Sequence, residues 1–226
     1  MSQPFSVAID GPAGAGKSTV AKAVAAELGA VYLDTGAMYR AMGLYMHRQG
    51  YKTPEAIAAH VNEPQIGVHF SEGKQIMTLN GEDVTEAIRR PEASLLASLV
   101  GGVAEVRRRL VRLQQEFAQG HSVVMDGRDI GTDVLPQATV KFFLTASAEE
   151  RARRRFLELQ QKGSTDSYEK VLEEIKRRDW QDAHRAASPM RQAEDAVQVD
   201  TSDMTLEEAI SRISEIAREA IARKVN

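Results

Sequence analysis

A glycine-rich loop that directly follows a short apolar stretch constrains this chain more than any other feature. The loop spans residues 11–18 and reads Gly-Pro-Ala-Gly-Ala-Gly-Lys-Ser, and the apolar stretch spans residues 7–9. It fits the pattern G-x-x-x-x-G-K-[ST], in which glycines let backbone N–H groups turn inward around phosphate oxygens. Because such a loop joins a strand to a helix, the sequence predicts an α/β fold and a site for a nucleoside triphosphate.

Two residues of the loop carry specific chemistry. Lys17 would bring a positive charge to the outer phosphates, and the Ser18 hydroxyl would reach a bound Mg²⁺. The helix after the loop would point its positive end at the same place. The alternative is a Gly/Ala-rich turn that only caps an ordinary helix, and the strand before and the helix after the loop argue against it.

Composition excludes several classes of protein. The formal net charge is −3, so the molecule as a whole is not a polyanion binder and a nucleic-acid partner is not expected. The chain has no cysteine, which removes disulfides, thiolate metal sites and cysteine nucleophiles. Its first residues show no basic region followed by an apolar one, and no run of about 18 apolar residues occurs, so we expect a cytoplasmic protein without a membrane span.

The order of apolar and amphipathic segments predicts a single domain with a parallel five-stranded sheet and helices on both faces. The strands are expected at residues 5–9, 31–33, 122–125, 140–144 and 197–199. Gly29 is suited to end a helix over residues 17–28. A last helix is expected over residues 205–223, with one apolar stripe toward a core. The stripe consists of Leu206, Ile210, Ile213, Ala217 and Ile221.

One stretch, residues 66–84, breaks this alternation. Polar and apolar residues alternate there on both sides of a turn, which predicts a small antiparallel hairpin. Asn80-Gly81 offers a second tight turn and hence a third short strand. An insertion of this kind could cover a substrate, although a plain surface elaboration fits the pattern equally well.

Charged residues follow two of the predicted strands. Residues 34–40 read Asp-Thr-Gly-Ala-Met-Tyr-Arg, and residues 126–129 read Asp-Gly-Arg-Asp. Ligands of open α/β sheets bind beyond the carboxyl ends of strands, so both segments should face the crevice of the phosphate loop. Arg40 and Arg128 could meet phosphate, and Asp126 could help hold Mg²⁺ or its water shell.

Each of these segments could also have a purely structural role. Asp34 or Thr35 could only cap the helix that follows it. An Asp/Gly turn such as residues 126–129 also occurs without a ligand.

A basic segment lies in the last third of the chain. Four arginines, Arg151, Arg153, Arg154 and Arg155, share one predicted helix, and a break at Gly163 separates it from a second basic helix. The second group consists of Lys176, Arg177, Arg178 and Arg185. Interleaved glutamates indicate a solvated face for several of them. A mobile arginine-rich helix pair could also act as a lid that stabilises the charge of a transferring phosphoryl group.

Taken together, these motifs resemble those of bacterial cytidylate kinases, which are nucleoside monophosphate kinases. The segment 34–40 is similar to the monophosphate-side motif of that family, 126–129 to its acidic turn, and 178–185 to its Arg-Asp-x-x-Asp-x-x-Arg segment. Thr35 stands where many relatives have Ser, and Met190 where Leu is frequent, and neither change removes a functional group. The residues similar to the ATP loop are Gly11, Pro12, Ala13, Gly14, Ala15, Gly16, Lys17, Ser18 and Thr19.

The resemblance implies a P-loop NTPase-type core over residues 1–60, 91–147 and 190–226. It implies a monophosphate-binding insertion over residues 61–90 and a lid with its following helix over residues 148–189. The catalytic residues would be Lys17, Arg128 and Arg178. Ser18 would bind Mg²⁺ directly, and Asp126 would bind it through water. The monophosphate would be bound by Thr35, Tyr39, Arg40, Ser98, Arg107, Arg128, Asp129, Arg178, Asp182 and Arg185.

The implied reaction transfers a phosphoryl group from ATP to CMP or dCMP, with no obligate protein partner and a monomeric chain. Ser98, Arg107 and Asp129 resemble the set that reads the cytosine edge. A carboxylate and an arginine complement the amino donor and the acceptor atoms of that edge. Two alternatives stay open at this point: another small acceptor such as UMP, AMP or shikimate, and a nucleotide-binding switch that signals to a partner protein.

Overall fold

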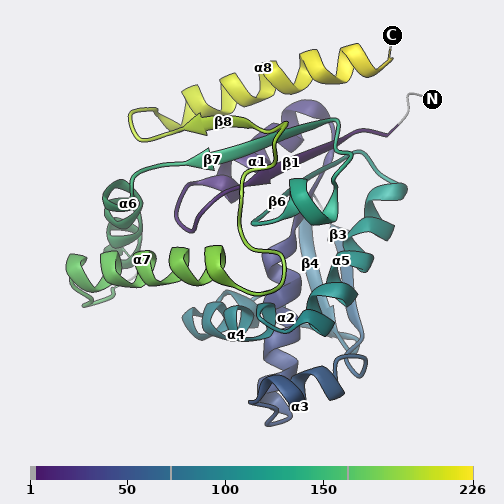
Figure 1. The fold of residues 1–226 in the computed structure, drawn as a ribbon, viewed down its shortest axis with the longest axis vertical. Helices are drawn as coiled ribbons and strands as arrows, with labels where there is room; N and C mark the ends of the chain where they lie inside the picture. The colour runs from purple at the N-terminus through teal and green to yellow at the C-terminus, as the bar shows by residue number, and fades with distance from the viewer. Residues whose placement is uncertain (1–3, 72, 162, 226) are drawn as a thin grey trace.

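Five strands form the parallel sheet that the sequence predicts. The computed structural model describes residues 4–71, 73–161 and 163–225. The strands run in the order β2-β6-β1-β7-β8, and every pairing between neighbours is parallel (Figure 1). The strands are β1 (Ser6–Asp10), β2 (Val31–Asp34), β6 (Val123–Gly127), β7 (Val140–Thr145) and β8 (Val197–Asp200). The number of strands and their positions are therefore confirmed.

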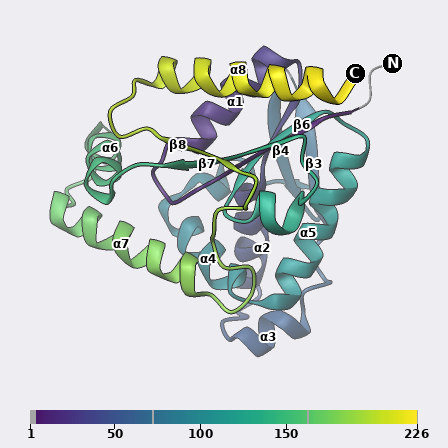
Figure 2. The ribbon, with the colours of Figure 1, turned by 45° about the horizontal axis from the view of Figure 1, so that its top comes forward.

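Helices cover both faces of this sheet, as predicted. Helices α1 (Lys17–Leu28) and α8 (Leu206–Val225) pack on one face over Val7 and Ile9. Helices α2 (Thr35–Arg48), α4 (Pro91–Gly101) and α5 (Ala104–Gln119) build the core on the other face, which includes Ala8. Figure 2 shows the two layers on opposite sides of the strands. The three central residues of β1, Val7, Ala8 and Ile9, are all apolar because both faces of the strand are buried there.

The stripe expected on the last helix is only partly correct. Ile213 and Ala217 are fully buried, and Ala209 joins them. Leu206 is 42% exposed instead. Periodicity gives the angular position of a residue around a helix, but it does not say how far along its length the helix is covered. Among the helices of the described ranges, none is both long and apolar enough to cross a membrane.

The segment that breaks the alternation forms a second, antiparallel sheet. Its strands are β3 (Ile66–Ser71), β4 (Lys74–Leu79) and β5 (Glu82–Asp83), in the order β3-β4-β5. Asn80 and Gly81 have φ of 52° and 85°, the left-handed pair that a tight hairpin turn requires. The predicted three strands are confirmed. Along the chain, the small sheet follows α3 (Pro54–Ala59) and precedes the short helix η1 (Ala87–Arg89).

The small sheet is joined to the edge of the large one by a side chain. Gln75 of β4 accepts a hydrogen bond from the Asp34 backbone N–H at 2.8 Å and donates to the Asp34 carbonyl at 3.3 Å. Met77 and Leu79 of the same strand enter the core under α2. The end of β2 is therefore fixed to the insertion.

Helices α6 (Ala148–Gln161) and α7 (Tyr168–His184) form a pair at the side of the molecule away from β3 and β4 in both views (Figures 1 and 2). A small core of their own holds the pair together, formed by Ala152, Val171 and Ile175. Gly163 has a φ of 81° in the turn between them, as the predicted break requires. Arg185 follows α7 directly. The division of the chain into core, insertion and lid stays a prediction.

Candidate functional site

The phosphate loop lies between β1 and α1, in the context that its pattern demands. A Cβ atom at Gly11 would lie 1.9 Å from the carbonyl oxygen of Leu144 in the neighbouring strand β7, so only glycine fits there. Gly16 precedes α1 with a φ of 81°, and no side chain in the described part of the chain caps the helix. The N–H groups of the first turn are thus left for a ligand, and the helix dipole favours an anion.

Lys17 is a buried cation that belongs to this loop. Its ammonium group donates to the Pro12 carbonyl at 2.6 Å, and no carboxylate of the described residues forms an ion pair with it. Burial lowers the pKa of Lys17 well below its usual value, and the nearby charge of Arg128 adds to this effect. The lysine therefore lies at the loop without an ion pair among the described residues, although the carboxylates of Asp126 and Asp10 attract it.

Asp126 ends β6 beside the loop and has both carboxylate oxygens occupied. The Ser18 hydroxyl donates to one oxygen at 2.7 Å and the Tyr32 hydroxyl to the other at 2.8 Å. The Thr35 hydroxyl donates to the Asp126 carbonyl at 2.7 Å. Burial raises the pKa of Asp126. Ser18 and Asp126 offer the hard oxygen atoms that Mg²⁺ prefers, so the pair fits the predicted metal site.

A second group of predicted residues gathers around Asp129. Its carboxylate accepts hydrogen bonds from Arg107 of α5 and, at 3.2 Å, from Arg185. The guanidinium carbon of Arg107 lies 5.5 Å from the ring centre of Tyr39 in α2. Burial raises the pKa of Tyr39 to about 12, so this ring stays neutral. Four predicted residues from separate parts of the chain thus meet in one place.

A third group lies between the end of β6 and α7. Arg128 donates to Asp182 at 2.8 Å, and Arg185 lies 3.9 Å from the same carboxylate. Arg178 has no ion-pair partner among the described residues, and its Nε atom is buried without a hydrogen bond. Burial lowers the pKa of Arg178 to about 10, and the charge of Arg128 contributes. Like charges are therefore gathered here around an unpartnered arginine.

Two predicted residues have other contacts. Arg40 forms an ion pair with Asp34 at 2.7 Å, and Asp34 also accepts from the Ala37 N–H and so caps α2. The capping alternative is thus correct for Asp34. Ser98 is exposed on α4 and donates to the carbonyl of Ser94 in the same helix at 3.2 Å. Its hydroxyl is therefore turned onto its own helix rather than bonded to Asp129.

Sequence reasoning missed three residues that hold this site in place. Asp10 accepts hydrogen bonds from the backbone at Ile130 and Gly131. Tyr32 fixes Asp126, and Arg151 of α6 donates to the Ala13 carbonyl of the phosphate loop at 3.0 Å. Asp10 and Tyr32 lie on strands beside the motifs, so their place in the sheet was a usable signal. Arg151 could not be distinguished from the other arginines of its helix.

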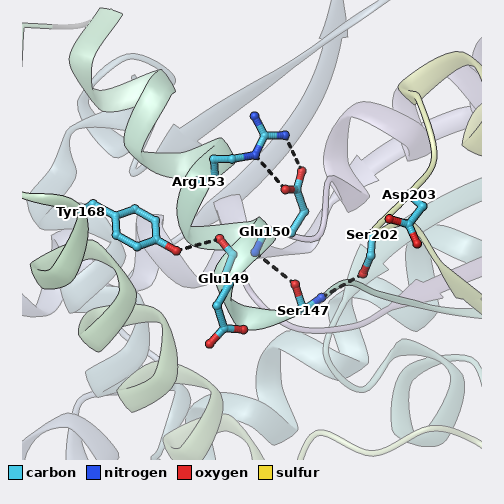
Figure 3. Close-up of a pocket in the computed structure, with 7 residues that line it drawn as sticks. All are labelled: Ser147, Glu149, Glu150, Arg153, Tyr168, Ser202 and Asp203. Atoms are coloured by element: carbon cyan, nitrogen blue, oxygen red, sulfur yellow. Dashed lines mark hydrogen bonds and ion pairs between the residues drawn. The ribbon is translucent and has the colours of Figure 1, made fainter.

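A cavity of about 340 Å³ lies beside α6 and contains none of the predicted site residues (Figure 3). Its lining residues are Ser147, Glu149, Glu150, Arg153, Tyr168, Ser202 and Asp203. The Ser147 N–H donates to the Ser202 hydroxyl at 3.1 Å, and Arg153 pairs with Glu150 at 2.8 Å. Three carboxylates and one arginine make it an unsuitable place for a phosphate.

Comparison with known proteins decides the family. The family model described as cytidylate kinase matches residues 7–219. The chain belongs to the cytidylate kinase family. It is 49% identical to the protein named cytidylate kinase from Caldicellulosiruptor bescii, over 98% of this chain and 99% of that protein. It is 51% identical to the one from Caldanaerobacter subterraneus subsp. tengcongensis, over 94% of each chain.

The cytidylate kinase family is one of kinases, so the predicted phosphotransferase class is confirmed. The fold recurs beyond the family. A crystal structure of an uncharacterized protein from Eubacterium ventriosum superimposes with a TM-score of 0.52 at 14% identity, and covers 96% of this chain and 99% of that chain. At such low identity this likeness concerns the fold alone.

Proposed function

We propose that this chain transfers the γ-phosphoryl group of ATP to the 5′-phosphate of CMP or dCMP and releases ADP with CDP or dCDP. Its membership of the cytidylate kinase family supports the reaction. The observation that carries the proposal is a pair of cations, Lys17 and Arg178, without a carboxylate partner among the described residues. The other predicted cationic residues each have such a partner: Arg40, Arg107, Arg128 and Arg185.

A positive charge that has no ion pair among the described residues, next to the start of a helix, suits a polyanion. Lys17 lies at the loop for the triphosphate, and Arg178 lies on the lid side. Burial lowers the pKa of Lys17 and of Arg178 most, and the charge of Arg128 is the second cause in both cases. All three positive charges therefore act at the same place. Two phosphorylated ligands bound there would bring negative charge, and each would reduce the repulsion among these positive side chains.

In the reaction, an oxygen of the acceptor phosphate bonds to the γ-phosphorus. The bond from that phosphorus to the oxygen bridging to the β-phosphate breaks, and ADP leaves with the electron pair. The acceptor phosphate is already anionic near neutral pH, so no general base is required. Lys17, Arg128 and Arg178 would align the two polyanions and stabilise the charge on the transferring group.

Ser18 and Asp126 would hold the magnesium ion, since their adjacent oxygen atoms suit it. When bound, Mg²⁺ would neutralise charge on the nucleotide phosphates. Tyr32 would keep the Asp126 carboxylate oriented, because it donates to the oxygen that Ser18 does not use.

The acceptor base would be read from the Asp129 side. Asp129 accepts hydrogen bonds and Arg107 donates them, which complements the amino group and the acceptor atoms of cytosine. The Ser98 hydroxyl would have to leave the Ser94 carbonyl to take part. Closure of the α6–α7 pair and of the small sheet would exclude water from the phosphoryl group.

The proposal is tested by ADP release from ATP and Mg²⁺ with CMP, UMP, AMP and GMP as acceptors in turn. We expect CMP to give the highest kcat/KM, with UMP behind it. A higher kcat/KM with AMP or UMP than with CMP would move the function to the alternative acceptor. Equal ADP release with and without any acceptor would favour a nucleotide-binding switch.

A matched pair of variants tests the unpartnered arginine itself. Arg178→Met removes the charge that has no carboxylate partner, whereas Arg177→Met removes the exposed neighbouring one. We expect kcat with CMP to fall about a hundredfold in the first variant and less than twofold in the second. Equal effects of the two substitutions would contradict the role given to Arg178.

A further inference from the structure

Asp10 ends β1 directly before the phosphate loop, yet its side chain contacts a distant part of the chain. One carboxylate oxygen accepts from the backbone N–H of Ile130 at 2.8 Å, and the other accepts from that of Gly131 at 2.7 Å. These residues open the single helical turn η2 (Ile130–Val134), which follows the end of β6. Asp10 is only 4% exposed, so both hydrogen bonds form away from solvent.

The first amides of a helical turn have no carbonyl partner within the turn, so another group must satisfy them. The residue before η2 is Asp129, and aspartate in that position usually accepts from these amides with its own carboxylate. Here the Asp129 side chain makes no capping hydrogen bond. Its two oxygens accept instead from Arg107 and Arg185. Asp10 satisfies the amides in its place.

We propose that Asp10 is a positioning residue that caps the turn η2 and thereby keeps the Asp129 carboxylate with Arg107 and Arg185, where it would read the acceptor nucleoside. This inference rests on the proposed function, because it assigns Asp129 to the acceptor. Without the Asp10 carboxylate, the amides of Ile130 and Gly131 would compete with Arg107 and Arg185 for the Asp129 oxygens. The acceptor side would then lose its geometry, while the phosphate loop would keep its own.

The backbone explains why the two sides would respond differently. Asp10 is paired in register with Gly127 of β6 on one side and with Phe143 of β7 on the other. The strand before the loop therefore stays fixed when only the side chain of Asp10 changes. The turn η2 pairs with no strand of the described residues, so the Asp10 carboxylate is a main anchor for its first residues.

The charge state of Asp10 agrees with this role. Burial raises the pKa of Asp10 to about 6, and the hydrogen bonds from Gly131 and Ile130 oppose the rise. Asp129 adds to the rise and Lys17 opposes it. Asp10 is therefore mostly ionised at neutral pH and can accept from both amides.

The test compares the wild-type chain with Asp10→Asn, in which one oxygen becomes an NH₂ group that cannot accept. We expect KM for CMP to rise about tenfold and KM for ATP to change less than twofold. Hydrogen exchange at the amides of residues 130 and 131 should become faster. Equal rises of both KM values, or unchanged values of both, would overturn the proposal.

Asp133→Asn is the matched control, because it removes a negative charge from the same turn without touching Asp10. We expect it to change KM for CMP less than twofold, and an increase as large as that of Asp10→Asn would overturn the proposal. If Asp10→Asn does not fold, hydrogen exchange of the wild-type chain tests the cap. Both amides are bonded to the buried Asp10 carboxylate, so slow exchange at residues 130 and 131 of the wild-type chain supports the cap, and exchange as fast as in an unstructured peptide contradicts it.

The experiment also separates this inference from the proposed function. If the wild-type chain releases no ADP in response to CMP, the proposed function fails. The exchange rates at residues 130 and 131 still show whether Asp10 caps the turn. If the wild-type chain is active and the two KM values respond together, only the role of Asp10 fails.

Discussion

The donor and acceptor sides of this site are built in opposite ways. The phosphate loop is a continuous run of residues 11–18, whose backbone N–H groups and single lysine need no ion pair among the described residues. The acceptor side consists of separate elements whose arginines and aspartates are bonded to one another, as Arg107 and Arg185 are to Asp129. The loop is thus a local structure, whereas the acceptor side is a network in which each change affects its neighbours.

The largest expected effect lies on the donor side. Lys17→Met removes the ammonium group while it keeps most of the side-chain length, and we expect kcat to fall about a thousandfold. Lys17 forms no ion pair among the described residues, but the buried carboxylates of Asp126 and Asp10 attract it. Its removal takes away both the cost of burying a charge and this attraction, so the free energy of unfolding should change little. Steady-state kinetics and urea unfolding measure the two quantities.

Lys22→Met is the matched control for this variant. Lys22 lies on the same helix, is exposed, and sits 5.6 Å from the ring centre of Tyr32. Its loss should change kcat less than twofold. Full activity of Lys17→Met would contradict the role of the loop lysine, and a large loss of stability would contradict its status as an unpaired charge.

Asp129→Asn tests the acceptor side and should behave differently. We expect kcat/KM for CMP to fall about a hundredfold while KM for ATP changes little. The substitution also leaves the buried guanidinium of Arg107 without its carboxylate, which should lower the free energy of unfolding by about 3 kcal/mol. A variant with wild-type stability would show that the acceptor side is not the coupled network described above.

The same contrast explains how much the sequence could predict. The loop, the strand before it and the helix after it follow from neighbouring residues, so all three were predicted from pattern alone. The central strands β1 and β6 were predicted because both faces of the sheet are buried there and their apolar runs are continuous. Family resemblance named Arg107, Asp129 and Arg185, and the fold brings them together.

The sequence could mark Asp10 by its place beside the loop, but it could not name the partners that join distant segments. Gln75 joins the small sheet to Asp34, and Asp10 joins β1 to the turn at Ile130. Neither side chain differs in type from many others in the chain, and only the three-dimensional path of the backbone gives it a partner. The hydroxyl of Ser98 likewise points to its own helix, which its position in the motif did not indicate.

The smallest expected effect distinguishes among the arginines of the lid, whose roles the sequence left open. Arg151 donates to the phosphate loop and Arg154 donates to the Thr201 carbonyl at 2.6 Å. Among the described residues, Arg153 pairs only with Glu150 on the same helix, and its side chain is 60% exposed (Figure 3). We therefore expect Arg153→Ala to change both KM values and kcat less than twofold, since an exposed ion pair one turn apart contributes little.

Arg151→Ala is the matched variant, because it removes the same type of side chain two positions earlier in the helix. It takes a donor from the Ala13 carbonyl and leaves Asp179 without its ion-pair partner at 2.7 Å. KM for ATP should therefore rise several-fold in this variant, with KM for CMP less affected. A similar change in the Arg153 variant would mean that the donor side also depends on surface charge. The loop would then resemble the acceptor network more than its local structure indicates.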